Sequence, residues 1–190
     1  MASAVEQALQ SLAGTVQSGL VLGGVNTHST LPVGRYGQRL LLKIWAEVEA
    51  TTGTPFAHEV PSGLVFNSLR ACLFLRAYGN AKQCQPFGLL HRMQQRLFVE
   101  GAITNEEQEL LRLAQEFDWS IDSLAAALGE PSLHAQVRFE MESARAYGTA
   151  ALPSLLLETA GERRLLAGGY ADAQMICALV RDALALPPES

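Results

Sequence analysis

The residues of this chain that could do chemistry are few and lie far apart. Its three cysteines, Cys72, Cys84 and Cys177, form neither a C-x-x-C pair nor a zinc-binding spacing. Cys72 and Cys177 lie in apolar runs and are expected to be core residues. Cys84 precedes Pro86 at a predicted helix start, where the helix dipole would lower a thiol pKa, but a half-exposed thiol without a task is the simpler interpretation. We therefore predict no catalytic residue and no metal site in these 190 residues.

The other polar side chains give no stronger pattern. His28, His58, His91 and His134 stand alone, without the H-x-x-x-H spacing of a zinc site. The Gly23-Gly24 pair does not make a G-x-G-x-x-G phosphate loop, and it is read instead as a bend or a close backbone approach.

One stretch, residues 150–158 (AALPSLLLE), gives the chain its organisation. Pro153 stands immediately before an apolar run of strand length, and a proline fits the first residue of a strand because it cannot donate to the ladder. A turn (159–162), a second apolar run (163–167), Gly-Gly-Tyr (168–170) and an amphipathic helix follow. This order resembles the C-terminal half of a thioredoxin-like fold, in which the X-Pro bond is cis. An ordinary trans proline that opens a strand is the alternative.

Composition excludes several classes of protein. Hydrophobic residues make up 48% of the chain, which is enough for a sizeable core, and the net charge is −5. Lysines and arginines are scattered, so nucleic acid is not an expected partner. No apolar run approaches about 20 residues, so no membrane span is expected. The N-terminus lacks the pattern of a signal peptide, and we expect a cytoplasmic protein.

Periodicity predicts a helix at 3–12, a strand at 16–25 and a long helical block between two α/β pieces. The block contains a helix with the stripe Leu40, Leu41, Ile44, Trp45 and Val48, and further helices at 65–77, 87–100, 104–117, 121–128 and 131–147. Residues 104–107 (TNEE) form a capping box with Thr at the N-cap. Ser120 is the expected N-cap of the following helix. We thus expect one discontinuous domain, 1–32 with 148–190, and a helical insertion domain, 33–147.

Several stretches in this order resemble the DsbA family, in its protein-disulfide-isomerase-like branch. They are residues 20–25 (LVLGGV), 52–56 (TGTPF), 90–101 (LHRMQQRLFVEG), 148–157 (GTAALPSLLL) and 168–170 (GGY). The resemblance implies an α/β, thioredoxin-like fold with a large all-helical insertion, whose first strand is missing from the chain. It also implies a substrate-binding cis-Pro loop at Ala151, Leu152 and Pro153, which offers backbone groups to a peptide by strand addition.

In that family a C-x-x-C at the start of the first helix performs thiol–disulfide exchange. Here the resemblance begins inside that helix, so the family's first strand and its C-x-x-C would lie upstream of Met1. The strand would be central, and its absence would leave an apolar gap with two unpaired edges. We consider three explanations: an upstream start, a gap filled by another chain as in a homodimer, or a rearranged, redox-inactive relative.

Three functions follow from the resemblance. The first is a thiol–disulfide oxidoreductase or isomerase acting on protein or peptide thiols, inactive in the given 190 residues. The second is a non-redox module that binds a peptide or a partner at the cis-Pro edge. The third is a glutathione-dependent isomerase that binds glutathione at the same loop, for which Ser3 is the nearest hydroxyl, although a serine there is typical of an N-cap. No other cofactor is expected.

Overall fold

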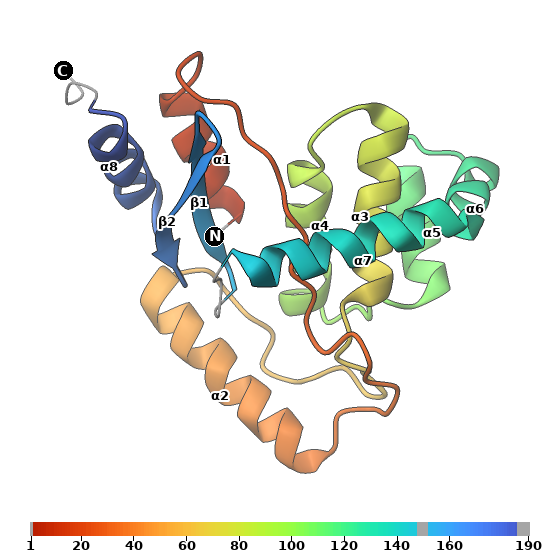
Figure 1. The fold of residues 1–190 in the computed structure, drawn as a ribbon. Helices are drawn as coiled ribbons and strands as arrows, with labels where there is room; N and C mark the ends of the chain where they lie inside the picture. The colour runs from red at the N-terminus through yellow and green to blue at the C-terminus, as the bar shows by residue number, and fades with distance from the viewer. Residues whose placement is uncertain (1, 148–151, 186–190) are drawn as a thin grey trace. The chain divides into compact units, whose positions relative to one another are not determined.

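The computed structural model describes residues 2–147 and 152–185 of the chain. Along these residues the order is seven helices, a two-stranded hairpin and an eighth helix (Figure 1). The elements are α1 (Ala2–Ser11), α2 (Arg35–Thr52), α3 (Leu69–Lys82), α4 (Phe87–Phe98), α5 (Glu107–Glu116), α6 (Ile121–Gly129), α7 (Pro131–Ala146), β1 (Ser154–Thr159), β2 (Glu162–Gly168) and α8 (Ala173–Ala183).

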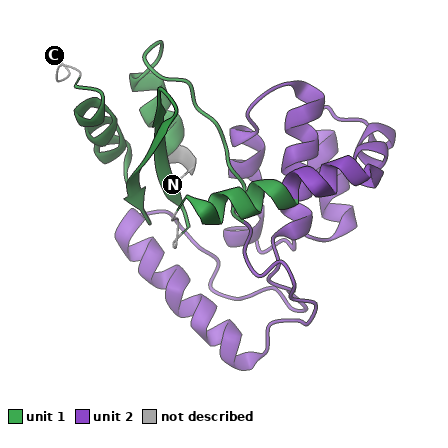
Figure 2. Ribbon diagram, in the orientation of Figure 1, with its two compact units in different colours: residues 1–23, 138–190 green, residues 24–137 purple. Residues whose placement is uncertain are grey.

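The chain divides into two compact units (Figure 2). Unit 1 consists of residues 1–23 and 138–190, and unit 2 of residues 24–137. Both ends of the sequence thus belong to one unit and enclose the other along the chain. The domain assignment made from the sequence, with boundaries at 32 and 148, stays a prediction.

In unit 1, the antiparallel hairpin β1–β2 provides the sheet, and helices α1 and α8 pack against each other and against the hairpin. A two-residue turn joins the strands, with Ala160 at φ 48° and Gly161 at φ 86°. Positive φ at both positions is typical of a type I′ turn, whose twist matches that of the flanking strands. The core of the unit consists of buried residues from the two helices, from the turn that follows α1 and from the connection before α8: Ala4, Ala8, Leu12, Ala171, Ile176, Cys177 and Val180.

The strand predicted at 16–25 is absent, and this expectation was wrong. Residues 16–24 have no regular secondary structure. A strand needs a ladder partner, and the only sheet among the described residues is β1–β2. The backbone N–H of Leu22 instead donates to the Glu140 carboxylate at 2.9 Å. Of the apolar side chains in this stretch, Leu22 is buried, while Val21 and Val25 are exposed.

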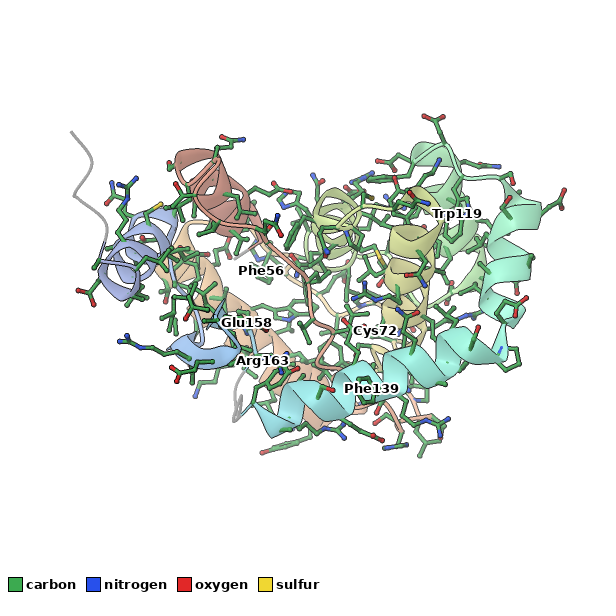
Figure 3. The ribbon with its side chains drawn as sticks, turned by 45° about the horizontal axis from the view of Figure 1, so that its top comes forward. Phe56, Cys72, Trp119, Phe139, Glu158 and Arg163 are labelled. Carbon is green, nitrogen blue, oxygen red and sulfur yellow. The ribbon has the colours of Figure 1, made fainter. Side chains whose placement is uncertain are left out.

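Unit 2 is helical because its apolar residues recur at helical spacing. The buried side chains of α3, α4, α5 and α6 include Phe74, Leu75, Leu89, Met93, Leu110, Leu113 and Leu124. Phe74 has no exposed surface and lies 5.7 Å, centroid to centroid, from the ring of Trp119 (Trp119 and Cys72, from the same interior, are labelled in Figure 3). Ser120 caps α6 as predicted, because its Oγ accepts the N–H of Ser123 at 3.2 Å.

Two predicted helix starts were wrong, for one reason. The third helix begins at Leu69 rather than Val65, and the fifth at Glu107 rather than after a Thr104 cap. Asn67 donates to the carbonyls of Thr27 and Ser29, and Asn105 donates to the carbonyl of Asn67. These long-range hydrogen bonds keep 65–68 out of the helix and residues 104–105 in a turn, so the capping box does not form.

Among the described residues, no helix combines the length and the apolar character that crossing a membrane requires.

Candidate functional site

The loop that leads into β1 is the candidate site that the sequence analysis named. The Leu152–Pro153 peptide bond is cis, as expected. Ala151, the third residue of that prediction, lies outside the described residues. The carbonyl of Pro153 accepts the N–H of Gly169 at 2.8 Å, which closes the end of the hairpin opposite its turn. The loop is therefore fixed by a backbone hydrogen bond to Gly169, the residue that follows β2.

Both the backbone and the side chain of Leu152 are available for contacts with a ligand. Its side chain is 50% exposed and lies over Gly23, where an added Cβ would come within 2.8 Å of Leu152 Cδ2. The Gly23-Gly24 pair predicted a bend or a close backbone approach, and the group that comes close to Gly23 is the Leu152 side chain. In the described part of the chain, the N–H and C=O of Leu152 have no hydrogen-bond partner. One residue thus offers a donor, an acceptor and an apolar side chain to a ligand.

The neighbouring surface comes from the end of β2. Gly169 has φ 101°, a conformation that favours glycine, and it turns the chain toward α8. Tyr170, the next residue, is half exposed. Asp172 then caps α8 by accepting the N–H of Met175 at 2.8 Å. These contacts position the Gly169–Tyr170 step beside the Pro153 carbonyl.

β1 itself pairs with β2 on one edge only. Glu158 and Arg163 face each other across the ladder and form an ion pair at 2.7 Å near the turn (Figure 3). Within the described residues, no strand lies along the other edge of β1. A sheet edge with a free donor and acceptor at its entry can add an extended peptide as a further strand.

The cysteines do not belong to this loop. Cys72 and Cys177 are buried, as predicted, in α3 and α8. The Cys177 thiol lies 3.8 Å from the carbonyl of Ala8. Cys84 is exposed and precedes Pro86, the N-cap of α4. The described residues contain no cluster of His, Cys, Asp and Glu that could hold a metal ion, and the side chain of Ser3 is not described.

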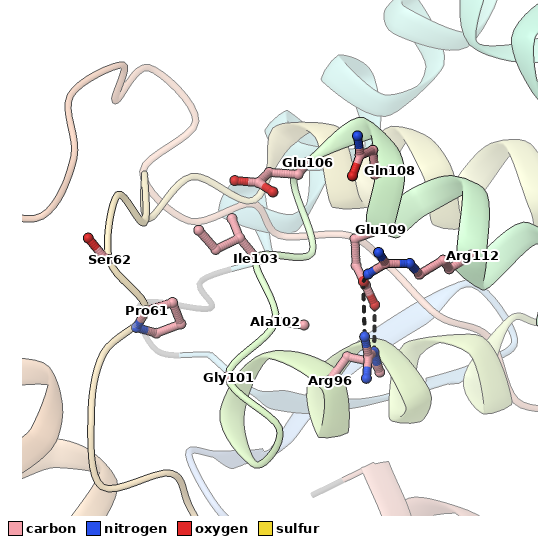
Figure 4. A pocket seen from close by; sticks show the side chains of 10 residues that line it. All are labelled: Pro61, Ser62, Arg96, Gly101, Ala102, Ile103, Glu106, Gln108, Glu109 and Arg112. Atoms are coloured by element: carbon pink, nitrogen blue, oxygen red, sulfur yellow. Dashed lines mark hydrogen bonds and ion pairs between the residues drawn. The ribbon is translucent and has the colours of Figure 1, made fainter.

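A polar cavity of about 380 Å³ lies in unit 2, between α4, α5 and the loop at 61–62 (Figure 4). The charged residues that line it are Arg96, Glu106, Glu109 and Arg112. Glu109 is only 4% exposed, and its two oxygens accept from Arg96 Nε at 2.5 Å and Nη2 at 3.0 Å, and from Arg112 Nη1 at 3.1 Å. Arg96, Glu109 and Arg112 therefore pair with one another in the cavity wall.

The same arginines form a network that sequence reasoning missed. Arg92 and Arg96 both bind the Glu100 carboxylate, and Arg92 also binds Glu116 at 2.6 Å. The pKa of Glu109 is lowered mainly by hydrogen bonds from Arg96. The pKa of Glu100 is lowered mainly by hydrogen bonds from Arg92. The only sequence signal was the four-residue spacing of Arg92, Arg96 and Glu100, which places them along one helix side.

The structure also explains two stretches that carried the family resemblance. In 52–56 (TGTPF), Gly53 ends α2 with φ 67°, and Phe56 follows. In 98–101 (FVEG), Phe98 ends α4 and Gly101 has φ 69°. The rings of Phe56, Phe98 and Trp45 pack with centroids 5.7–6.2 Å apart. The two stretches therefore build one aromatic cluster and have a structural role.

Comparisons with known proteins identify the type of fold. No family profile and no curated protein matches the sequence. Solved structures do match, over nearly all of the chain. One is a Nitrosomonas europaea protein provisionally described as a protein disulfide isomerase, with a TM-score of 0.87 and 19% identity, covering 97% of this chain and 89% of that one.

A second is the cytosolic disulfide reductase DsbM from Pseudomonas aeruginosa, with a TM-score of 0.73 and 24% identity, over 94% of this chain and 91% of that one. The structure of DsbM with GSH matches with a TM-score of 0.71 and 24% identity, over 95% and 92%. Because all these identities are below a quarter, the likeness concerns the fold. The chain has an α/β fold of the thioredoxin-like, DsbA type.

Proposed function

We propose that this protein belongs functionally with the DsbA-like thiol–disulfide oxidoreductases and that its Leu152–Pro153 loop binds the extended backbone of a thiol-containing substrate. The observation that carries this proposal is the free N–H and C=O of Leu152 at the open entry of β1. Likeness of fold to a disulfide reductase supports the choice of a thiol or disulfide as the reactive part of the substrate.

A peptide backbone fits this site for a physical reason. A strand that pairs with Leu152 gains two backbone hydrogen bonds, and the exposed leucine side chain gives it an apolar contact. The Pro153–Gly169 bond holds the loop in place before the substrate arrives, so little ordering is needed on binding. Binding of this type recognises an extended backbone and selects weakly among side chains.

Binding and exchange are separate in this proposal. Dithiol exchange requires two cysteines that can form a disulfide with each other, and Cys72, Cys84 and Cys177 include no C-x-x-C. We therefore expect these 190 residues to bind substrate without catalysing insulin reduction. Insulin turnover by the 190-residue protein would overturn that part of the proposal.

Glutathione is the second candidate ligand, and one observation favours it: a similar structure, that of DsbM, was solved with GSH. Glutathione is a short peptide with one thiol, so the same backbone pairing at Leu152 would hold it. We propose the cytoplasm as the compartment, which the description of DsbM as cytosolic supports.

The test is a titration of isotope-labelled protein with reduced glutathione and, separately, with a short extended peptide that contains one cysteine. We expect changes in the amide chemical shifts of residues 152, 154–155 and 168–170. Leu152→Arg should weaken binding at least tenfold, about 1.4 kcal/mol. Leu165→Arg is the matched control, since Leu165 is an exposed leucine of β2, 44% accessible, away from the loop.

Each outcome is informative. Shifts caused by the peptide alone favour a protein substrate, and shifts caused by both ligands include glutathione. No shift with either ligand, shifts far from residues 152 and 169, or equal binding by the two arginine variants would each refute the site.

A further inference from the structure

Helix α2 carries an exposed apolar row on its outer side. The row consists of Tyr36, Leu40, Ile44 and Val48, spaced four residues apart, with exposed fractions of 75%, 47%, 43% and 37%. Residues four apart on a helix form a continuous ridge. Single exposed apolar residues are ordinary, but four in one ridge form a contiguous patch of the kind that marks an interaction surface.

The other side of α2 already has a partner. Trp45 is 4% exposed, and its ring packs on Phe56 and Phe98 of unit 2. The helix is therefore held in place by one face, while the row of Tyr36, Leu40, Ile44 and Val48 faces outward. The outer row is not needed for that packing, so its apolar character calls for a separate explanation.

The charges beside the row indicate what would cover it. Arg39 and Lys43 in the first half of α2 and Glu47 in the second half lie on the side of the row, and Lys43 and Glu47 form an exposed pair at 3.8 Å. Glu49 belongs to the other side, where its carboxylate accepts the N–H of Phe56 at 3.4 Å. A second copy laid antiparallel would place the basic first half of each row beside Glu47 of the other copy, whereas a parallel copy would place like charges together. The mixed signs do not favour an anionic membrane surface or a nucleic acid as the occupant.

We infer that this face is a homodimer interface, in which the α2 ridges of two copies pack antiparallel about a two-fold axis near Ile44. Such an interface is isologous, since the same patch is used by both copies. Leu40 of one copy then lies beside Val48 of the other, and Arg39 lies on the side of the other copy's Glu47.

The dimer should be weak. An 18-residue helix is about 27 Å long, and a ridge-in-groove contact between two such helices lies at the low end of protein interfaces, below roughly 1,200 Å² in total. Interfaces of that size are typical of transient complexes. We therefore expect a concentration-dependent equilibrium with a dissociation constant in the micromolar range.

Sedimentation of the full 190-residue protein, from about 1 µM to about 1 mM, tests the inference. Ile44→Glu should weaken dimerisation at least tenfold. Ile121→Glu is the matched control: Ile121 is 44% exposed and stands at the first position of α6 in the same unit, where an acidic side chain is favourable. Far-UV circular dichroism checks that both variants fold.

Orientation has its own test, made in a Cys84→Ser background that removes the exposed thiol. A mixture of Leu40→Cys and Val48→Cys chains should form mainly mixed disulfides. Disulfides between two Leu40→Cys chains would indicate a parallel contact and overturn the arrangement. A monomer at every concentration, or a dimer that Ile44→Glu and Ile121→Glu weaken equally or not at all, would overturn the interface.

Discussion

Replacing Glu109 by glutamine should remove the most buried charge of unit 2 while keeping the shape of the side chain. The Glu109 side chain is 5% exposed, and its partner Arg96 is 22% exposed. Three hydrogen bonds from arginine nitrogens, at 2.5, 3.0 and 3.1 Å, reach its carboxylate. Glutamine keeps one acceptor oxygen but carries no charge, so Arg96 and Arg112 lose a counter-ion.

The expected loss of unfolding free energy at pH 7 is about 2–3 kcal/mol. Removing one partner of a buried ion pair generally costs about 3–5 kcal/mol. The lower value applies because Arg96 keeps its ion pair with Glu100 and is partly solvated. For a chain of this size the loss corresponds to a melting temperature lower by about 5–10 °C.

The loss should depend on pH in a definite direction. The pKa of Glu109 is lowered in the folded protein, chiefly by the hydrogen bonds from Arg96. Its contribution to stability is therefore complete above the unfolded pKa of about 4.3 and disappears as pH falls through the lower folded pKa. Since glutamine does not titrate, the difference between the two proteins should be constant from pH 7 to about 5 and should shrink at lower pH.

Urea unfolding followed by tryptophan fluorescence measures this loss. Both tryptophans, Trp45 and Trp119, belong to unit 2, so the signal reports the unit that contains Glu109. Urea is preferred to guanidinium because a salt would screen the ion pair. Glu107→Gln is the control: its side chain is 76% exposed and 3.9 Å from Arg70, so we expect a change below about 0.5 kcal/mol. Equal losses in the two variants, or a Glu109→Gln loss that is independent of pH, would refute the reasoning.

Three further results are expected. Gly53→Ala should lower the unfolding free energy by about 1 kcal/mol, because Gly53 has φ 67° while an added Cβ meets no atom within 4 Å; no change in urea unfolding would contradict this. Phe74→Ala should lower the unfolding free energy by about 3–5 kcal/mol, since the Phe74 side chain is fully buried. A loss below about 1 kcal/mol would contradict this, because it would mean that neighbouring residues fill the cavity. Iodoacetamide should label Cys84 in the native protein and Cys72 and Cys177 only after unfolding, as peptide mass spectrometry would show; equal labelling rates would contradict the burial.

The sequence predicted the helices well because helical periodicity is a local signal. Each helix expected from an apolar stripe is present, and the Ser120 cap of α6 is in place. Predictions failed where distant partners decided the outcome. The TNEE stretch at 104–107 reads as a capping box, but Asn105 bonds to the carbonyl of Asn67, far away in the sequence. The apolar residues 16–25 read as a strand, but β-structure depends on a neighbour that no local pattern reveals.

The position of the cis-proline loop was predictable, but its contacts were not. A proline before an apolar run placed the loop at Leu152–Pro153. The free backbone groups of Leu152 and the closure by Gly169 depend on the hairpin register, which the sequence alone does not define. The Glu109 network could not be foreseen either, because a glutamate in an amphipathic helix is ordinarily solvated, and its burial depends on how α4 and α5 meet.

The turn between β1 and β2 can be stabilised by a single substitution. Its two residues both need positive φ, which Asn-Gly adopts easily and Ala-Gly does not. Ala160 therefore lowers the stability of the hairpin by about 1 kcal/mol. Ala160→Asn should restore much of this stability, and a higher melting temperature of unit 1 would show it. Because the Leu152–Pro153 loop lies at the opposite end of the hairpin, such a variant would stabilise the protein for binding studies while leaving the proposed site untouched.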